Sequence, residues 1–222
     1  MRAAVLFDVD GTLVDTPYLH AVCWWEALRQ KEQYVPMATI HRAIGMGSAE
    51  LFDHLLGSDR DRSGDEKLKA THLALYAQYW GRLRPLPGAA DLLRACADRG
   101  LAVVLASSAN PTELAALRSA LNADDAITAA TSAADAEAGK PAPDILEAAL
   151  DQADVAADQS VFVGDAVWDA DAASRLGIPF VGVSCGGTSA AELREHGAVE
   201  VYRDPADLLR SLDDSAIARL TR

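Results

Sequence analysis

Short apolar runs alternate along the chain with stretches whose apolar residues recur at helical spacing. Each run is bounded by glycine, proline, serine or charged residues, which is typical of a buried strand. We predict strands over residues 3–7, 101–106, 126–129, 160–163, 178–183 and 198–202. The helical stretches between them cover residues 89–99, 111–121, 143–151, 169–176, 190–196 and 205–212. This order predicts an α/β fold, in which helices cover a parallel sheet.

Residues 15–85 interrupt the alternation, because they contain no strand pattern and read as several helices. Chain-breaking sequences flank this segment: Asp-Thr-Pro at residues 15–17 and Arg-Pro-Leu-Pro-Gly at residues 84–88. Proline and glycine at both edges favour hinge-like connections. We therefore predict a Rossmann-like core domain formed by residues 1–14 and 86–222, with an inserted all-helical cap domain formed by residues 15–85.

End signals support several of the predicted helices. Asn110 precedes Pro111, and Glu113 stands at the third helical position, which is the pattern of a capped helix N-terminus. Gly100 and Gly177 follow two predicted helix ends, where glycine commonly closes a helix.

The composition limits the class of ligand. The chain has 222 residues, of which 33 are acidic and 20 are basic, and its formal charge is −13. This charge argues against nucleic acid or an anionic membrane surface as the partner, so a phosphate ligand must be held by local positive charge. Acidic residues interrupt the apolar N-terminal stretch before it could serve as a signal or membrane segment. Three scattered cysteines indicate neither a zinc site nor disulfides, and we expect a cytoplasmic protein.

The first candidate for chemistry is the sequence Asp-Val-Asp-Gly-Thr at residues 8–12, at the carboxyl end of the first predicted strand. Open α/β sheets bind their ligands at this edge. Side chains two residues apart on a strand share a face, so Asp8 and Asp10 can converge on one point. Two adjacent carboxylates repel each other unless a cation or a shared proton relieves them. The alternative for these five residues alone is a pair of exposed aspartates in a turn.

A second pair of carboxylates, Asp165 and Asp169, follows the strand predicted over residues 160–163. With Asp165 at the strand end and Asp169 in the first helical turn, both can face the first pair. Four carboxylates around one point predict a hard divalent cation, and oxygen ligands with positions open to water and phosphate favour Mg²⁺. The alternative for Asp169 is a favourable interaction with a helix N-terminus.

Hydroxyl and lysine side chains occur at or beside two further strand ends. Ser107 and Ser108 precede the capped helix, where a hydroxyl and free backbone N–H groups can bind phosphate oxygens. Lys140 stands between Gly139 and Pro141 beside a helix start, where it could neutralise phosphate charge. Taken singly, such a serine is more often a helix cap and such a lysine is more often a solvated surface residue. Their ordered occurrence at strand ends favours a shared phosphate site.

These elements resemble the four ordered motifs of the haloacid dehalogenase superfamily, carried here by residues 8–12, Ser107, Lys140, and Gly164-Asp165 followed by Asp169. The likeness spans nearly the whole chain. The helical insert directly after the first motif, and the run Lys-Pro-Ala-Pro-Asp at residues 140–144, resemble the branch that holds phosphoglycolate phosphatases and β-phosphoglucomutases. The resemblance implies a Rossmann-like core with a mobile helical cap.

By this resemblance, Asp8 is the nucleophile that forms an aspartyl-phosphate, and Asp10 is the acid and base that serves the leaving oxygen and then water. Ser107 and Lys140 would hold the transferring phosphoryl oxygens. The implied ligands of Mg²⁺ are Asp8, the backbone carbonyl of Asp10, Asp165 and Asp169.

Residues expected to contact the substrate come from both parts of the chain. They are Gly11 and Ser108 in the core, and His20, Gly45 and Gly47 in the cap. The cap is expected to set the substrate, because its closure excludes bulk water and brings a second set of side chains to the leaving group. The alternative for His20 is a helix-face histidine directed at water or at the cap core.

The resemblance implies a Mg²⁺-dependent phosphatase acting on a small phosphorylated metabolite, phosphoglycolate- or sugar-phosphate-like. The alternative is a sugar phosphomutase, but Ala49 stands where β-phosphoglucomutases carry an arginine for the second phosphate. Haloacid dehalogenation needs no magnesium and would leave Asp165 and Asp169 without a purpose. A non-enzymatic, phospho-accepting receiver module is shorter and lacks both the helical insert and the second aspartate. We expect a monomer or a weak homodimer.

Overall fold

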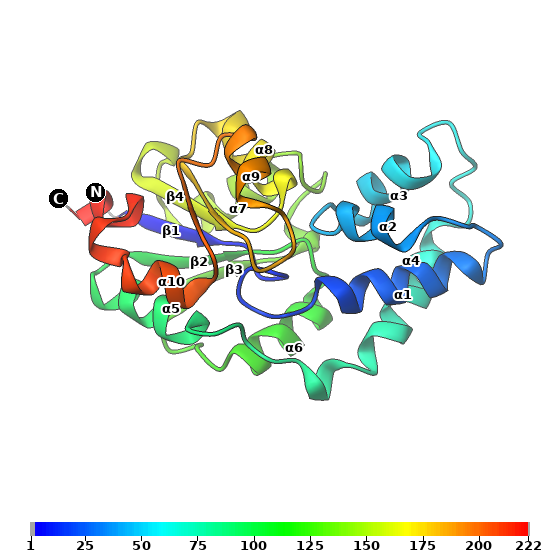
Figure 1. Cartoon of the computed structure of the whole chain (residues 1–222), viewed down its shortest axis with the longest axis horizontal. Helices are drawn as coiled ribbons and strands as arrows, with labels where there is room; N and C mark the ends of the chain where they lie inside the picture. Colours follow the sequence, from blue (N-terminus) through cyan, green and yellow to red (C-terminus); the bar gives the residue numbers. More distant parts are fainter. Residues whose placement is uncertain (1–2, 222) are drawn as a thin grey trace.

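The computed structural model describes residues 3–221 and contains a six-stranded parallel sheet with helices on both faces (Figure 1). The strands are β1 (Ala4–Phe7), β2 (Ala102–Ala106), β3 (Ala129–Thr131), β4 (Ser160–Gly164), β5 (Phe180–Val183) and β6 (Glu200–Tyr202). Their order in the sheet is β3-β2-β1-β4-β5-β6. Phe7 of β1 pairs with Leu105 of β2 and with Val163 of β4. The carboxyl ends of these three interior strands therefore lie side by side.

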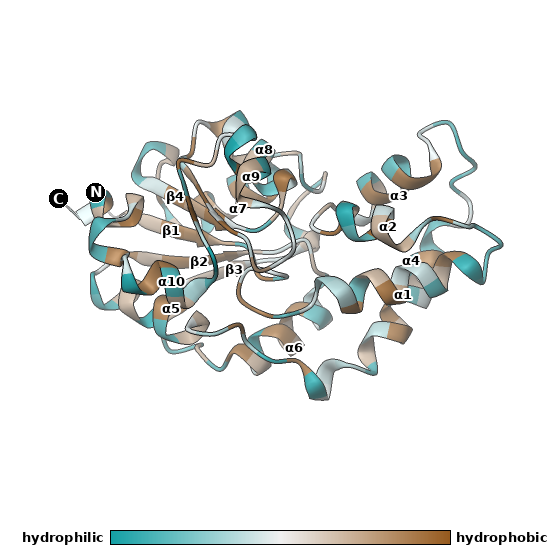
Figure 2. Ribbon diagram, viewed as in Figure 1, coloured by the Kyte–Doolittle hydropathy of each residue, from teal (hydrophilic) through white to brown (hydrophobic). Residues whose placement is uncertain are grey.

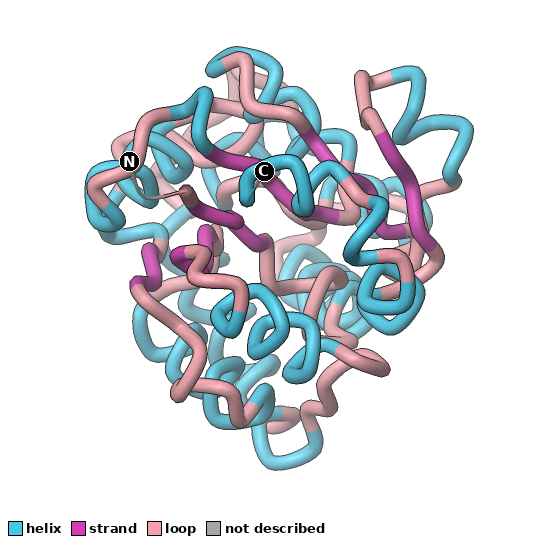
Figure 3. The backbone as a smooth tube through the Cα atoms, turned by 90° about the vertical axis from the view of Figure 1, so that its left-hand side faces the viewer, coloured by secondary structure: helices cyan, strands magenta, loops and turns pink. Residues whose placement is uncertain are grey.

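Six helices cover the sheet: α5 (Ala89–Asp98), α6 (Pro111–Leu121), α7 (Asp144–Ala153), α8 (Val167–Leu176), α9 (Ala190–Glu195) and α10 (Pro205–Arg210). Val5 and Phe7 point into the apolar core formed with α5, α6 and α10, whereas Ala4 and Leu6 point into the core formed with α7, α8 and α9. In Figure 3 the strands lie between these helices, and Figure 2 shows hydrophobic residues along the strands. Because both faces are buried, the strands read as continuous apolar runs in the sequence.

The predicted α/β fold is confirmed, but one predicted strand is wrong in its position. We predicted a strand over residues 126–129, whereas β3 spans Ala129–Thr131. β3 is the edge strand beside β2 and is only partly buried, so no continuous apolar run marks it. The Thr131 hydroxyl instead donates a hydrogen bond to the Leu105 carbonyl at 3.2 Å. Helix α8 begins at Val167, two residues before its predicted start.

The chain between β1 and α5 forms four α-helices around an apolar core of their own, on one side of the sheet domain (Figure 1). These are α1 (Pro17–Arg29), α2 (Met37–Ala43), α3 (Ser48–Leu56) and α4 (Asp65–Ala77). The two connecting segments pair with each other, since Asp15 N–H donates to the Arg84 carbonyl and Leu86 N–H to the Leu13 carbonyl. The boundaries at residues 15 and 85 stay predictions. Among residues 3–221, no helix combines the length and the apolar character needed to span a lipid bilayer.

Candidate active site

Three carboxylates meet at the carboxyl edge of the sheet. Asp8 directly follows β1, Asp165 directly follows β4, and Asp169 lies in the first turn of α8. Because β1 and β4 are neighbours in register, their ends coincide. One oxygen atom from each carboxylate lies within 4.8 Å of the others, and all three residues are buried. The structure thus brings Asp8 together with Asp165 and Asp169, which lie more than 150 residues further along the chain.

Lys140 reaches this cluster from the loop that precedes α7. Its Nζ lies 2.6 Å from Asp8 Oδ1 and 2.9 Å from Asp169 Oδ1, and the side chain is fully buried. Burial would lower the pKa of Lys140, but the charges of Asp169 and Asp8 outweigh it and raise that pKa. Lys140 is therefore a charged interior residue rather than a solvated surface lysine. One ammonium group faces three carboxylates, so the cluster keeps a surplus of negative charge.

This surplus is reflected in the pKa values of the aspartates. Burial raises the pKa of Asp8 to about 7, although Lys140 opposes the rise. Burial, together with the charges of Asp8 and Asp169, raises the pKa of Asp165 well above its ordinary value. A divalent cation would relieve the repulsion, and clustered carboxylate oxygens are the ligands that Mg²⁺ prefers. The side chains of Asp8, Asp165 and Asp169 therefore fit a metal of this class.

The side chain of Asp10 belongs to a different set of contacts. Its Oδ1 accepts a hydrogen bond from the Thr16 hydroxyl at 2.6 Å and lies 3.1 Å from His20 Nε2. Burial alone would raise the pKa of Asp10, but the hydrogen bond and charge of His20, together with Thr16, lower it overall. Asp10 is thus held in one orientation and in its ionised form. Its carboxylate is therefore separate from the cluster of Asp8, Asp165 and Asp169.

The turn after β1 has a backbone that only glycine tolerates. Gly11 has a φ of +84°, and a Cβ at this position would lie 2.6 Å from Asp165 Oδ2 and 2.7 Å from Pro17. The missing side chain lets the loop pass close to Asp165. The next residue, Thr12, is fully buried and donates a hydrogen bond to Asp165 Oδ1 at 3.0 Å. This turn therefore fixes the position of a carboxylate that comes from a distant part of the chain.

The two predicted serines have different surroundings at the end of β2. Ser107 is fully buried, and its Oγ accepts a hydrogen bond from Ala109 N–H at 3.1 Å. Ser108 lines the cavity between core and cap, and its hydroxyl donates to the Gly45 carbonyl of the cap at 3.4 Å. Ser108 is therefore the one of the two that joins core and cap directly.

The cap also touches the core beside Lys140. Gly47 N–H donates to the Lys140 carbonyl at 3.3 Å, and Glu50 Oε1 accepts a hydrogen bond from Gly139 N–H at 3.0 Å. A Cβ on Gly47 would lie 2.6 Å from the Gly139 Cα, so this pair of glycines permits the close approach of two loops. Of the two cap glycines expected at the substrate, Gly45 lines the cavity and Gly47 packs on the core loop.

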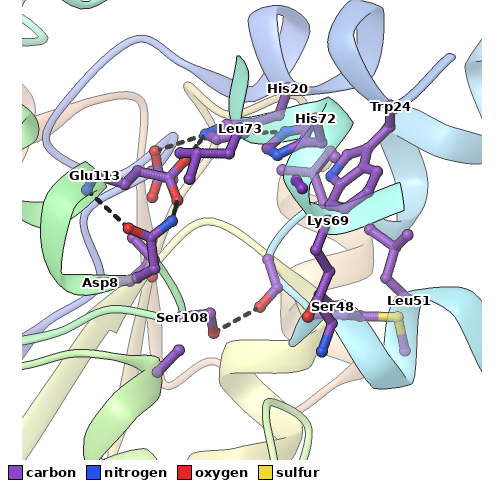
Figure 4. A pocket seen from close by; sticks show the side chains of 18 of the residues that line it. Asp8, His20, Trp24, Ser48, Leu51, Lys69, His72, Leu73, Ser108 and Glu113 are labelled. Carbon is purple, nitrogen blue, oxygen red and sulfur yellow. Dashed lines mark hydrogen bonds and ion pairs between the residues drawn. The ribbon is translucent and has the colours of Figure 1, made fainter. Parts of the chain in front are cut away.

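A cavity of about 380 Å³ lies between core and cap. Figure 4 shows Asp8 and Ser108 on one side of it and Trp24, Lys69 and Leu51 on the other. A space of this size suits a small ligand rather than a polymer. The site is therefore a partly open pocket, and the carboxylates of Asp8, Asp10 and Glu113 line its core side.

Two buried residues that line this pocket, His72 and Glu113, are absent from the sequence-based candidates. His72 Nε2 lies 3.1 Å from His20 Nδ1, and its ring stacks on Trp24 with 3.9 Å between the centroids. Glu113 Oε1 lies 3.7 Å from His20 Nε2, and burial raises the pKa of Glu113 to about 7. Glu113 was interpreted only as part of a helix start. No local pattern marks His72, because its position depends on how α1 packs against α4.

The family model and two relatives agree on one family of proteins. The model of the haloacid dehalogenase-like hydrolase family matches residues 3–177. A phosphoglycolate phosphatase from Rhodospirillum rubrum is 31% identical, over 94% of this chain and 90% of its own length. A phosphoglycolate phosphatase from Escherichia coli is 28% identical, over 94% of this chain and 91% of its own length.

Solved structures show the same architecture. A hydrolase from Pseudomonas syringae superposes with a TM-score of 0.91 at 33% identity, covering 96% of this chain and 99% of that one. A β-phosphoglucomutase from Clostridium difficile superposes with a TM-score of 0.84 at 18% identity, covering all of both chains. At that identity the second likeness concerns the fold alone.

Proposed function

The chain belongs to the haloacid dehalogenase-like hydrolase family and is a phosphatase, and on this premise we propose that it is Mg²⁺-dependent and forms an aspartyl-phosphate on Asp8. Its substrate would be a small phosphorylated metabolite, phosphoglycolate- or sugar-phosphate-like. The observation that carries the proposal is the buried group of Asp8, Asp165, Asp169 and Lys140, which reaches the pocket between core and cap through Asp8.

The proposed metal ligands are the carboxylates of Asp8, Asp165 and Asp169 and the backbone carbonyl of Asp10. When bound, Mg²⁺ supplies charge neutralisation for the carboxylates and for the transferring phosphoryl group. Asp169 Oδ2 also accepts hydrogen bonds from the backbone N–H groups of Asp165 and Ala166, which holds it at the start of α8. Thr12 holds Asp165 in the same way.

In the first proposed step, a carboxylate oxygen of Asp8 attacks the phosphorus atom while the bond between phosphorus and the ester oxygen breaks. Asp10 gives a proton to the departing oxygen. A dianionic phosphate ester in the pocket would raise the pKa of Asp10 by like-charge repulsion, which favours the protonated form that this step needs. Lys140 steadies Asp8 from 2.6 Å and offers positive charge to the phosphoryl oxygens.

In the second proposed step, Asp10 takes a proton from a water molecule whose oxygen attacks phosphorus. The bond to Asp8 breaks, phosphate leaves and the carboxylate is restored. Thr16 and His20 suit Asp10 to this role, because their contacts favour its ionised form. Ser107, Ser108 and the backbone at Gly11 are proposed to bind phosphate oxygens, and His20 and Gly45 to face the leaving group.

A sugar phosphomutase would use the same two aspartates but return the phosphoryl group to the sugar. That reaction needs a cation for a second phosphate. Ala49 supplies none at the start of α3, and the ammonium group of Lys69 is already paired with Glu66. Hydrolysis is therefore the reaction that we propose.

The test is an assay of the purified protein with Mg²⁺ against a panel of phosphorylated metabolites that includes phosphoglycolate and hexose phosphates. Both free phosphate and isomerised product are measured, with and without a chelator. We expect free phosphate from at least one substrate, and its loss on chelation. If a hexose phosphate isomerises while no substrate releases phosphate, the proposed hydrolysis is wrong.

A further inference from the structure

Glu113 is a buried carboxylate of the pocket that the proposed mechanism does not use. It lies in the first turn of α6 and is 5% exposed. Its Oε2 accepts a hydrogen bond from the Asn110 side chain at 3.2 Å. Its Oε1 is buried and has no hydrogen-bond partner among residues 3–221. Figure 4 shows Glu113 on the same side of the pocket as Asp8.

The nearest positive group does not satisfy this oxygen. His20 Nε2 lies 3.7 Å from Glu113 Oε1, beyond hydrogen-bond distance, and is 3.1 Å from Asp10 Oδ1 instead. A buried acceptor without a donor is costly, and more so when it carries charge. Such an oxygen in the wall of a ligand pocket marks a place where the ligand itself supplies the donor.

The opposite wall offers little to an anionic leaving group. Its ammonium group is Lys69, whose Nζ lies 2.9 Å from Glu66 Oε1 one helical turn away. Both residues line the pocket, and Glu66 already offsets much of the charge that Lys69 could offer to a carboxylate on the ligand. Trp24 and Leu51 beside them are apolar. A second anionic group on the substrate would therefore meet Glu113 and Asp10, two carboxylates that share the single ring of His20, on one side and the Lys69–Glu66 pair on the other.

We propose that Glu113 is a specificity-determining residue, whose free Oε1 accepts a hydrogen bond from a donor group on the leaving group of the substrate. This inference rests on the proposed phosphatase activity and narrows its substrate class. The favoured substrates are phosphate monoesters whose leaving group carries a hydroxyl or an ammonium group near the ester oxygen. Esters with a carboxylate at that place, phosphoglycolate among them, are disfavoured.

A purely structural role does not account for the same contacts. A helix cap needs only the N-terminal groups of α6, and the Asn110 side chain already accepts hydrogen bonds from the backbone of Thr112 and Glu113. Holding Glu113 in place needs only Oε2. The second oxygen is left without a donor, in a residue that lines the pocket and adds a carboxylate to a site that is already acidic.

Three phosphate esters of the same length test the proposal: hydroxyethyl phosphate, aminoethyl phosphate and phosphoglycolate. They differ in a terminal hydroxyl, ammonium or carboxylate group. The wild-type enzyme is assayed with Mg²⁺ at about pH 8, above the pKa of about 7 that burial gives Glu113. We expect kcat/KM to be roughly tenfold or more higher for at least one of the two donor esters than for phosphoglycolate, and their order tells hydroxyl from ammonium recognition.

The variant Glu113→Gln keeps the shape of the side chain but removes its charge, and its amide can donate to a carboxylate. The ratio of kcat/KM between donor ester and phosphoglycolate should fall by about tenfold or more. Glu195→Gln, on the exposed surface of α9, is the matched control and should leave the ratio unchanged. A ratio is used because a general loss of folding or catalysis lowers both rates together.

The outcomes separate this inference from the proposed function. If phosphoglycolate is hydrolysed as well as both donor esters, or if Glu113→Gln leaves the ratio where it is in the wild type, the role of Glu113 is wrong and the phosphatase stands. If neither these esters nor any ester of the wider metabolite panel releases phosphate with Mg²⁺, the proposed function itself fails.

Discussion

The two walls of the pocket are built on different principles. The core wall presents the carboxylates of Asp8, Asp10 and Glu113, and the fully buried Lys140 pairs with Asp8. The cap wall presents apolar side chains, the rings of His20 and His72, and one ion pair, Lys69 with Glu66. Chemistry therefore belongs to the strand ends, whose positions the sheet fixes, and the facing wall to helices that pack on a core of their own. Glu113, to which we assign selection among substrates, lies on α6 of the sheet domain.

The core wall is also the less favourable of the two for folding. Burying three carboxylates beside one ammonium group costs free energy, since each charge leaves water for a medium of lower dielectric constant. The cap wall carries less of this cost, because its ion pair is partly exposed and much of its remaining surface is apolar. Unfavourable burial of charge at a site indicates a functional role rather than a contribution to stability.

The largest expected effect tests whether chemistry belongs to the core wall. Asp8→Asn keeps the size of the side chain but removes the nucleophile. We expect kcat to fall by roughly four orders of magnitude or more, with the fold intact by circular dichroism. Asp98→Asn, at the exposed end of α5, is the matched control and should keep the wild-type rate. An Asp8→Asn protein that releases phosphate at the wild-type rate would end the proposed mechanism.

A smaller effect is expected at the seam between the walls. A Cβ at Gly139 would be forced against the Gly47 backbone, so Gly139→Ala should push the cap loop away from Lys140. We expect kcat/KM to fall by about tenfold, since a displacement of a fraction of an ångström at a site is felt strongly. Gly81→Ala is the control, because a Cβ there meets nothing within 4 Å. Equal activities of the two variants would show that the closed contact is not needed.

The smallest effect concerns protons and metal at the core wall. In the metal-free protein the pKa of Asp8 is raised from 3.8 to about 7, so the folded state keeps a proton that the unfolded chain has lost. This contribution lowers the free energy of unfolding as the pH rises from about 4 to about 7. Mg²⁺ competes with these protons, so it should raise Tm by roughly 5–10 °C at about pH 8 and by much less at about pH 5.

The measurement is thermal unfolding with saturating Mg²⁺ and with a chelator, at both pH values. Glu113, whose pKa burial also raises, contributes in the same direction with and without the metal. The difference between the two curves therefore isolates the carboxylate cluster. An increase in Tm of the same size at both pH values would contradict the metal site.

A feature could be predicted from the sequence where neighbouring residues determine it. Asp8 and Asp165 could be predicted because each follows a predicted strand, and the carboxyl ends of strands converge in a parallel sheet. Lys140 could be predicted because it stands between glycine and proline beside a helix start. The Asn110 cap could be predicted because capping is local, and its hydrogen bonds to Thr112 and Glu113 are present. The strand predicted over residues 126–129 failed because an edge strand needs no apolar run.

The sequence by itself determined the order of strands and helices and the carboxylates at strand ends, since periodicity and turn chemistry act over a few neighbouring residues. Only the tertiary structure decided that Lys140 is an interior residue, that His72 stacks on His20, and that one oxygen of Glu113 is buried without a donor. These facts depend on how the loop before α7 meets the sheet and on how α4 and α6 pack beside the cavity. Packing between elements far apart in the chain leaves no mark in the spacing of the residues themselves.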